Sequence, residues 1–365
     1  MKTVVAPRKP PPPRKRTRSL ALLVGLAVAG SVALLRQTGM LQSAELYAYD
    51  ALIRVQPDWG ADPRLVFVAV DDRTVARLNS DTLSDAALLA TLERLRAYAP
   101  RVIAVDIFRD VPIGPGRDAL LDYLNQQFLP LEGRIKPIIL TCQLPSLGNP
   151  RGIDPPPVLD PADGIGYADV ELDADKVVRR VAFSGVPATE TPFFGFALTP
   201  GPEVRCRAPF ALGFLSALSY LQTEGITLSR SAGGNFNVGG VRFAPLPRTM
   251  GGYNNLDPGL YQTLLAYRGR RPAVVVSLAD VLEGTADADV FRDRVVLLGY
   301  STLDKGDFHE TLWTTTGYLA PRPPCESGFG GSPRRPAADL GVAPLDRNPM
   351  DRRVGFSGSL GGTQD

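Results

Sequence analysis

Leu65-Val66-Phe67-Val68-Ala69-Val70-Asp71-Asp72 is the stretch that decides the fold of this 365-residue chain. Six consecutive apolar residues without alternation are typical of a strand that is covered on both faces of a sheet. A second such run, Val102-Ile103-Ala104-Val105, ends in Asp106, and a helical pattern over residues 85–98 lies between the two. Two such strands joined by a helix predict a right-handed parallel crossover. We therefore expect an α/β fold with a mixed, largely parallel sheet flanked by helices.

Further elements follow from periodicity and length. The pattern predicts a helix at 117–128, a strand at 136–141, a buried helix at 210–221 and a short helix from 278 that ends at Gly284. Residues 164–171 and 177–183 are strand-like and are predicted to form a hairpin around the polar turn at 172–176. Asp173 and Asp175 lie in that turn, but the central glycine and distal glutamate of an EF-hand are missing, which favours a turn over a calcium site.

The N-terminal region predicts export of the rest of the chain. Residues 19–36 are apolar or small up to Arg36 and are near the short end of what a membrane-spanning helix needs. Basic residues and no acidic residue precede this run, which favours a cytoplasmic tail at 1–18 and a main domain on the outer side, periplasmic or extracellular, of a bacterial inner membrane. A cleaved signal peptide ending at Ala27-Val28-Ala29 is the alternative to an uncleaved single-pass anchor. Either interpretation exports the domain.

Composition limits the classes of function. The chain has 40 Lys and Arg against 38 Asp and Glu, so nothing indicates a nucleic-acid partner. Three cysteines are too few for a small disulfide-stapled scaffold. A bridge between Cys142 and Cys206 is one option, but two unpaired buried thiols are the favoured interpretation.

Three aspartates are candidate ligand residues. Asp71, Asp72 and Asp106 follow two strands that are expected to be neighbours, and ligands bind at the carboxyl ends of strands in open α/β sheets. Helix capping is the favoured alternative for these carboxylates, and a metal-dependent hydrolase is a less favoured one. The chain lacks a Gly-x-Ser-x-Gly elbow and a phosphate-binding Walker loop, and the single histidine, His309, is interpreted as structural. We therefore expect no catalytic residue, no metal and no cofactor.

Arg179, Tyr267 and Arg268 are candidates for contacts to an anionic ligand. A guanidinium pairs bidentately with a carboxylate or phosphate, although arginine is just as often a salt-bridge partner within the protein.

The order of several short motifs resembles the second type of CHASE domain, over roughly residues 49–311. The motifs are Tyr49-Asp50-Ala51-Leu52-Ile53-Arg54, the strand into Asp71-Asp72-Arg73-Thr74, Val105-Asp106-Ile107-Phe108, Gly166-Tyr167-Ala168-Asp169 with Asp173 and Arg179-Arg180, Tyr267-Arg268, Ser277-Leu278-Ala279-Asp280-Val281-Leu282 and Val296-Leu297-Leu298-Gly299. The resemblance implies an extracellular sensory module of receptors that carry cyclase, histidine kinase or serine/threonine kinase outputs. It does not specify the ligand, which is expected to be a small molecule or a protein.

The resemblance also implies return membrane helices and a cytoplasmic output module after the sensory domain, which we place at residues 44–311. Residues 312–365 instead form a Gly/Pro-rich segment that is expected to be disordered or aberrant. A truncation or frame shift after Thr311 is one hypothesis for this departure. The sequence thus predicts a sensory module, with an anchored interaction or scaffold protein as the alternative and a homodimer as a further expectation.

Overall fold

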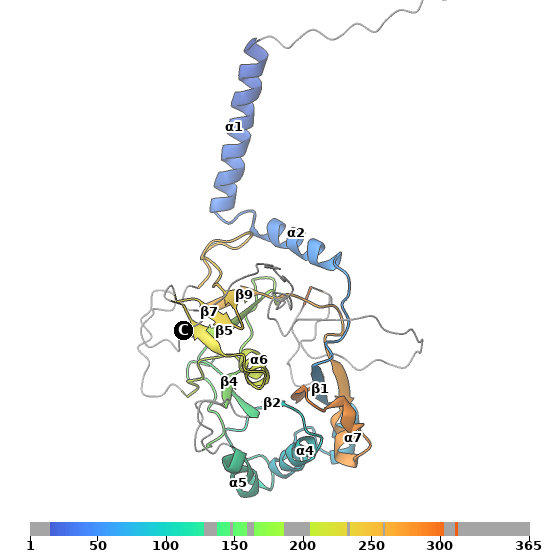
Figure 1. The fold of residues 1–365 in the computed structure, drawn as a ribbon. Helices are drawn as coiled ribbons and strands as arrows, with labels where there is room; N and C mark the ends of the chain where they lie inside the picture. Colours follow the sequence, from blue (N-terminus) through green and yellow to red (C-terminus); the bar gives the residue numbers. More distant parts are fainter. Residues whose placement is uncertain are drawn as a thin grey trace, which may run out of the picture.

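The computed structural model describes residues 15–127, 137–146, 149–158, 164–185, 205–231, 234–257, 260–302 and 311–312. His309 and most of residues 312–365 lie outside these ranges, as do residues 1–14. Helix α1 (Lys15–Gln37) stands away from the rest of the molecule, and α2 (Gln42–Arg54) follows it across the top of the domain (Figure 1). Within α1, Ser19–Gln37 is long and apolar enough to cross a membrane, and none of its residues is buried in the protein.

A parallel sheet of six strands forms the centre of the domain, as predicted. Its order is β10-β1-β11-β2-β3-β4. The strands are β1 (Leu65–Val70), β2 (Val102–Asp106), β3 (Ile138–Cys142), β4 (Ile165–Tyr167), β10 (Val274–Ser277) and β11 (Val295–Tyr300). All six residues of β1 are buried, because the sheet is covered on both faces.

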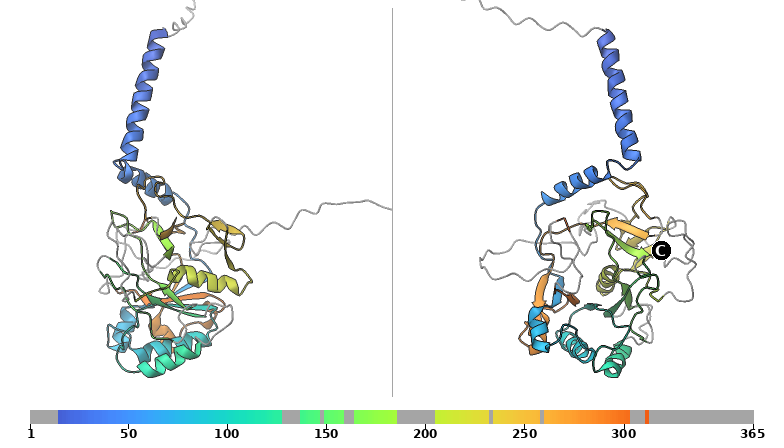
Figure 2. Two further views of the ribbon diagram at one scale, coloured as in Figure 1. Left: turned by 90° about the vertical axis from the view of Figure 1, so that its left-hand side faces the viewer. Right: turned by 180° about the vertical axis from the view of Figure 1, so that it is seen from behind.

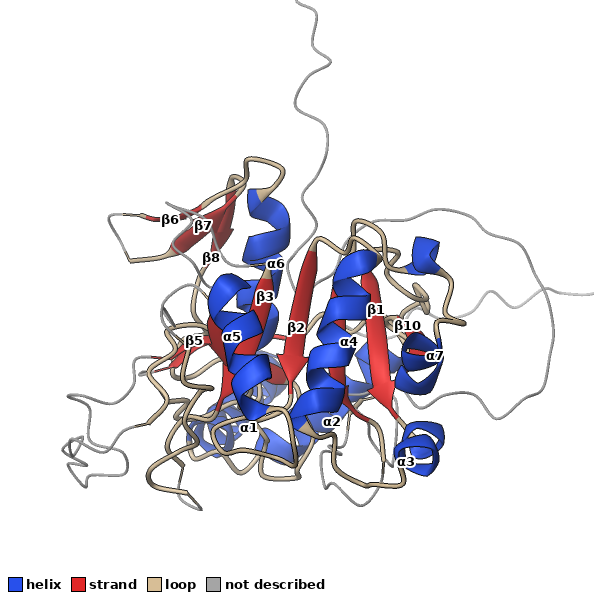
Figure 3. Ribbon diagram, turned by 90° about the horizontal axis from the view of Figure 1, so that it is seen from below, coloured by secondary structure: helices blue, strands red, loops and turns tan. Residues whose placement is uncertain are grey.

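Helices cover the two faces of this sheet (Figure 2). Figure 3 shows α4 (Asp85–Ala97) and α5 (Arg117–Gln127) on the face that is turned away from α1. Helix α6 (Leu212–Gln222) packs on the other face, against β2, β3 and β4. Two short helices, α3 (Asp72–Leu78) and α7 (Leu278–Glu283), pack against each other near β1, and a 3-10 helix spans Ala288–Val290.

Local sequence explains why α4 forms where it does. The Ser84 hydroxyl accepts a hydrogen bond from the Ala87 amide and caps the helix, a contact that typically contributes about 1 kcal/mol. Leu88, Leu92 and Leu95 recur at helical spacing and are fully buried against the sheet and its neighbouring helices.

Two smaller antiparallel sheets lie between the main sheet and α2 (Figure 1). One pairs β5 (Arg180–Gly185) with β9 (Leu260–Leu264), and the other contains β6 (Leu228–Arg230), β7 (Phe236–Val238) and β8 (Val241–Phe243). Phe183 is the centre of an aromatic cluster that joins them to α6, with its partners Phe214, Phe236, Phe243 and Tyr261.

The polar hairpin turn predicted at 172–176 is present, but the two strand-like segments that flank it do not pair with each other along their length, which corrects the predicted hairpin. Strand β4 joins the main sheet beside β3, whereas β5 pairs with β9, and only the Leu172–Val178 bridge links the two segments. Strand β4 also packs closely under α6. A Cβ at Gly166 would lie 2.6 Å from the Leu212 Cα, so glycine at this position lets the two backbones approach while β4 lies in the parallel sheet.

The favoured interpretation of Cys142 and Cys206 as free thiols is also wrong. The two sulfurs form a disulfide that joins the end of β3 to the segment before α6, with a Cα–Cα distance of 5.5 Å. Long-range backbone pairing brings them together, because the Tyr167 amide donates to the Phe210 carbonyl and Tyr167 is itself paired with Cys142. The sequence contained no information about that distance.

Candidate functional site

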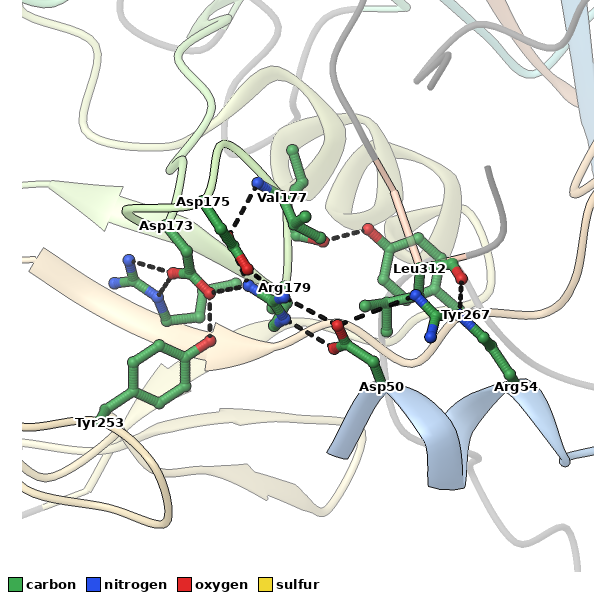
Figure 4. A network of polar contacts seen from close by, with 11 residues as sticks. Asp50, Arg54, Asp173, Asp175, Val177, Arg179, Tyr253, Tyr267 and Leu312 are labelled. Carbon is green, nitrogen blue, oxygen red and sulfur yellow. Dashed lines mark hydrogen bonds and ion pairs between the residues drawn. The ribbon is translucent and has the colours of Figure 1, made fainter. Parts of the chain in front are cut away.

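The Arg179 guanidinium fastens α2 to the body of the domain (Figure 4). Its Nε and Nη2 donate to the two carboxylate oxygens of Asp50 on α2, at 2.7 and 2.8 Å. Its two terminal nitrogens also donate to both oxygens of Asp175, at 2.8 and 2.6 Å, and Nη1 donates to Asp173 at 2.8 Å. The side chain of Arg179 is 2% exposed, so three carboxylates of the protein itself enclose it.

Arg180 extends this ion cluster on the other side of Asp173. Its Nε donates to Asp173 Oδ1 at 2.9 Å, and Nη1 donates to the Gln262 side-chain oxygen on β9. Tyr253 donates its hydroxyl to Asp173 Oδ2 at 2.8 Å, and its ring lies 4.8 Å from the Arg180 guanidinium carbon. We call Asp50, Asp173, Asp175, Arg179 and Arg180 the junction cluster.

Charge is nearly balanced at the junction. Three carboxylates face Arg179 and Arg180, and Arg54 of α2 lies 3.9 Å from Asp50 and adds a third cation. Burial opposes the charge of Arg179, but its hydrogen bonds to Asp50, Asp175 and Asp173 outweigh burial and raise its pKa above the usual value. The Arg179 hydrogen bond likewise lowers the pKa of Asp175.

The local backbone explains why these carboxylates converge. Asp173 and Val177 close the turn by a backbone hydrogen bond, and Lys176 adopts a left-handed conformation with φ of 64°. This turn directs both Asp173 and Asp175 back toward Arg179, so the predicted turn is present and its aspartates bind arginine. On α2, Asp50 shares one face with Leu46, which packs against Tyr253 and Leu256.

Tyr267 lies beside the junction cluster. Its hydroxyl donates to the Val178 carbonyl, and burial followed by the charge of nearby groups raises its pKa. Arg54 Nε donates to the Leu312 carbonyl at 2.7 Å, which brings the chain after β11 to the same place (Figure 4). The structure thus brings together two of the six predicted ligand residues, Arg179 and Tyr267.

Arg268 belongs to a separate buried ion pair. Its Nη1 lies 3.5 Å from Asp62 Oδ2, and Asp62 accepts from Arg64 Nε and Nη2 at 2.9 and 2.7 Å. Asp62 is fully buried at the turn that leads into β1, so this pair fixes the entry of the first strand.

Asp71 caps helix α3. Its Oδ1 accepts from the Thr74 amide at 2.9 Å, the Thr74 hydroxyl at 2.7 Å and the Ser277 hydroxyl at 2.9 Å. Asp72 is exposed in the first turn of α3, and Asp106 is exposed at the end of β2. The expectation that these aspartates follow neighbouring strands is wrong, because β11 lies between β1 and β2. Within the described ranges, no group of three or more His, Cys, Asp or Glu could hold a metal ion.

A second buried ion pair lies near the carboxyl edge of the main sheet. Arg109 Nε is 3.2 Å from Asp85 Oδ1 at the start of α4, and Arg117 Nη1 is 3.7 Å from Asp85 Oδ2. Burial lowers the pKa of Arg109, although Asp85 and Tyr300 oppose that effect. This pair holds the segment after β2 against α4.

Sequence reasoning missed Asp50, Asp173, Asp175 and Tyr253 as site residues. Asp50 belongs to the motif at residues 49–54. The segment Asp173-x-Asp175-x3-Arg179-Arg180 contains both the carboxylates and the arginines that pair in the cluster. The distance of 129 residues between Asp50 and Arg179 could not be bridged from one sequence.

One protein-family model matches most of the chain. The family model of the CHASE2 domain matches residues 24–321, a range that includes most of α1, all of α2 and the junction cluster. CHASE2 domains are sensory extracellular domains of signalling receptors rather than catalytic domains. Neither a curated protein nor a solved structure matches the chain. Because the match covers far more than half of its 365 residues, the chain belongs to the CHASE2 domain family.

Proposed function

We propose that this chain is the extracytoplasmic ligand-input module of a membrane receptor and that α2 transmits its signal. The observation that carries the proposal is the contact between Asp50 and Arg179. It ties the first helix after the candidate membrane span to the buried centre of the sensory domain.

The connection between the two helices favours transmission. Only residues 38–41 separate α1 from α2, and Gly39 makes the turn with φ of 77°. Arg36 at the end of α1 pairs with Glu45 of α2 at 3.2 Å. A shift of α2 against the domain would therefore displace the end of α1. A ligand can drive that shift only if it binds two arrangements of α2 with different affinity.

The proposal also assigns the residues that contact the ligand. Asp72 and Asp106 are exposed near the carboxyl ends of the main strands, where ligands of open α/β sheets bind. Arg179 is buried and Tyr267 is half-buried beside α2, and Arg268 is buried beside Asp62. We assign ligand contact to the exposed aspartates and propose that Arg179 and Tyr267 report on the ligand through α2.

A thermal-shift screen of the full chain in lipid nanodiscs tests the sensory role. We expect at least one small molecule to raise the melting temperature in a concentration-dependent way, because a ligand that binds only the folded state stabilises it by mass action. The Asp106→Asn variant should weaken that response, whereas Glu93→Gln on the exposed side of α4 should not. If no compound shifts the melting temperature and a protein partner copurifies stoichiometrically, the chain is an anchored interaction protein instead.

We also propose that residues 1–18 are cytoplasmic and that the domain lies outside the membrane. The basic flank before α1 and the disulfide between Cys142 and Cys206 support this orientation, because disulfides persist in oxidising compartments. A reporter fused after Leu312 tests it. Alkaline phosphatase should be active there and green fluorescent protein dark, and the reverse pattern would contradict the orientation.

A further inference from the structure

Helix α2 has an apolar face that is turned away from the domain. Its members are exposed, carry no charge and recur at helical spacing, from Ala44 through Tyr47, Ala48, Ala51 and Leu52 to the C-cap residue Val55. The large side chains are exposed to 71% at Tyr47, 65% at Leu52 and 80% at Val55. In a helix packed on a water-soluble domain these positions would be expected to carry polar residues.

The acidic residues of α2 lie on the side of the helix that contacts the protein. Asp50 is buried against Arg179, and Glu45 is paired with Arg36. Leu46 is buried with Tyr253 and Leu256. The helix therefore has two different faces, one that is fixed by ions and apolar contacts to the domain and one that is apolar and has no partner among the described residues.

The position of α2 identifies the occupant of its free face. Figures 1 and 2 show α2 lying across the direction of α1, between the end of α1 and the small sheets. Loop 248–256 holds the domain against that end, since Asn254 donates to the Gln37 carbonyl at 2.9 Å and Arg36 donates to the Gly251 carbonyl at 3.2 Å. When α1 spans a bilayer, α2 is thus fixed at the outer surface of the bilayer. The domain then lies on the side of α2 that faces away from the lipid.

We infer that α2 is an interfacial helix whose apolar face lies at the boundary between the headgroups and acyl chains of the outer leaflet. A helix with one apolar face binds there, and aromatic side chains such as the exposed Tyr47 are enriched at that depth. The inference rests on the proposed membrane anchoring by α1. Its consequence is that the bilayer contacts one face of α2 while Arg179 binds the other.

Site-directed fluorescence in nanodiscs tests the inference with the full chain. Single cysteines replace Tyr47, Leu52 or Val55 in a Cys325→Ser background, carry the environment-sensitive NBD fluorophore, and are compared in phosphatidylcholine with and without bromine on acyl carbons 6 and 7. Val28→Cys in α1 is the control for insertion of the span. Val111→Cys, an exposed valine in the segment after β2, is the control for a site in water.

We expect the three α2 probes to emit at shorter wavelength than the probe at residue 111 and to lose intensity in brominated lipid. If Val28→Cys is quenched and the α2 probes are not, the interfacial helix is refuted while the anchor stands. If the α2 probes resist both brominated lipid and aqueous iodide, a second copy of the chain covers the face and the inference is overturned. If Val28→Cys is not quenched either, the anchor itself fails, and the inference fails with it.

Discussion

Arg179 is the residue on which the junction depends. All of its donor nitrogens face carboxylates, and those carboxylates come from α2 and from the turn before β5. A buried ion pair of this kind contributes little net stability compared with apolar packing, but removal of one partner leaves uncompensated charge. Arginine fits this position because its planar fork pairs bidentately with both Asp50 and Asp175, which a lysine ammonium does not do.

Substitution of Arg179 should therefore be severe. Arg179→Met leaves Asp50, Asp173 and Asp175 with one guanidinium fewer, and we expect a loss of about 3–5 kcal/mol in the free energy of unfolding. Arg179→Lys should lose less, because it restores the charge but not the fork. Arg292→Met removes an exposed pair with Asp289 and should change stability by less than about 0.5 kcal/mol. Urea unfolding of the full chain measures all three, and equal effects at positions 179 and 292 would contradict this account.

Glu171 should make stability depend on pH. Burial raises its pKa above the ordinary 4.5, with the nearby charge of Arg180 opposing that effect. Because the folded pKa is raised, the folded state is favoured while Glu171 is protonated and loses stability as pH rises from 4.5 through the raised value. Glu171→Gln removes this loss, so its stability relative to wild type should increase from about pH 4 to about pH 7. The exposed Glu93→Gln variant should show no such trend in melting temperature.

At the scale of elements, the disulfide joins two parts of the fold that differ in kind. Cys142 ends a strand of the parallel sheet, and Cys206 precedes α6, which covers that sheet. In the chain-entropy description, a closed loop with a sequence separation of 64 stabilises the folded state by about 4 kcal/mol.

The double variant Cys142→Ala/Cys206→Ala should thus lower the free energy of unfolding by about 4 kcal/mol, and each single variant should lose a similar amount. Reduction of the wild type should reproduce that loss, whereas the double variant should not respond to the reductant. Paired urea titrations with and without dithiothreitol measure the difference. An identical wild-type midpoint in both conditions would argue against a stabilising bridge.

Elements with strong local signals could be predicted, and those defined by pairing could not. Unbroken apolar runs gave β1 and β2, and the leucine spacing gave α4. The insertion of β11 between β1 and β2 depends on a contact between residues that are almost 200 positions apart, which no local pattern encodes. Strand β4 was predicted as a strand but paired wrongly, because a strand-like pattern does not specify the neighbour, which here is β3 rather than β5.

The same limit applies to the candidate site. Arg179 and Tyr267 could be proposed from their side-chain chemistry, but their setting could not, because Asp50 and Arg179 meet only after the whole domain has folded. Asp71 was correctly given a capping alternative, since a carboxylate between a strand and a helix is a common N-cap.

At the scale of the whole molecule, a chain of contacts connects the domain centre to the candidate membrane span. It runs from the turn at 173–175 through Arg179 to Asp50, then along α2 to the end of α1. Within this chain of contacts, we expect the Asp50–Arg179 pair to hold α2 on the domain.

Hydrogen exchange of the full chain in nanodiscs tests that claim most directly, with wild type, Asp50→Asn, Arg179→Met and the double variant. Amides of α2 should exchange faster in each single variant than in wild type. The double variant should exchange no faster than the more affected single variant, because both substitutions remove the same contact. Amides of α4 report global unfolding and should lose no more protection than the measured fall in the free energy of unfolding accounts for. If α2 keeps its wild-type protection in Asp50→Asn while α4 does too, other contacts hold α2 and the claim is contradicted.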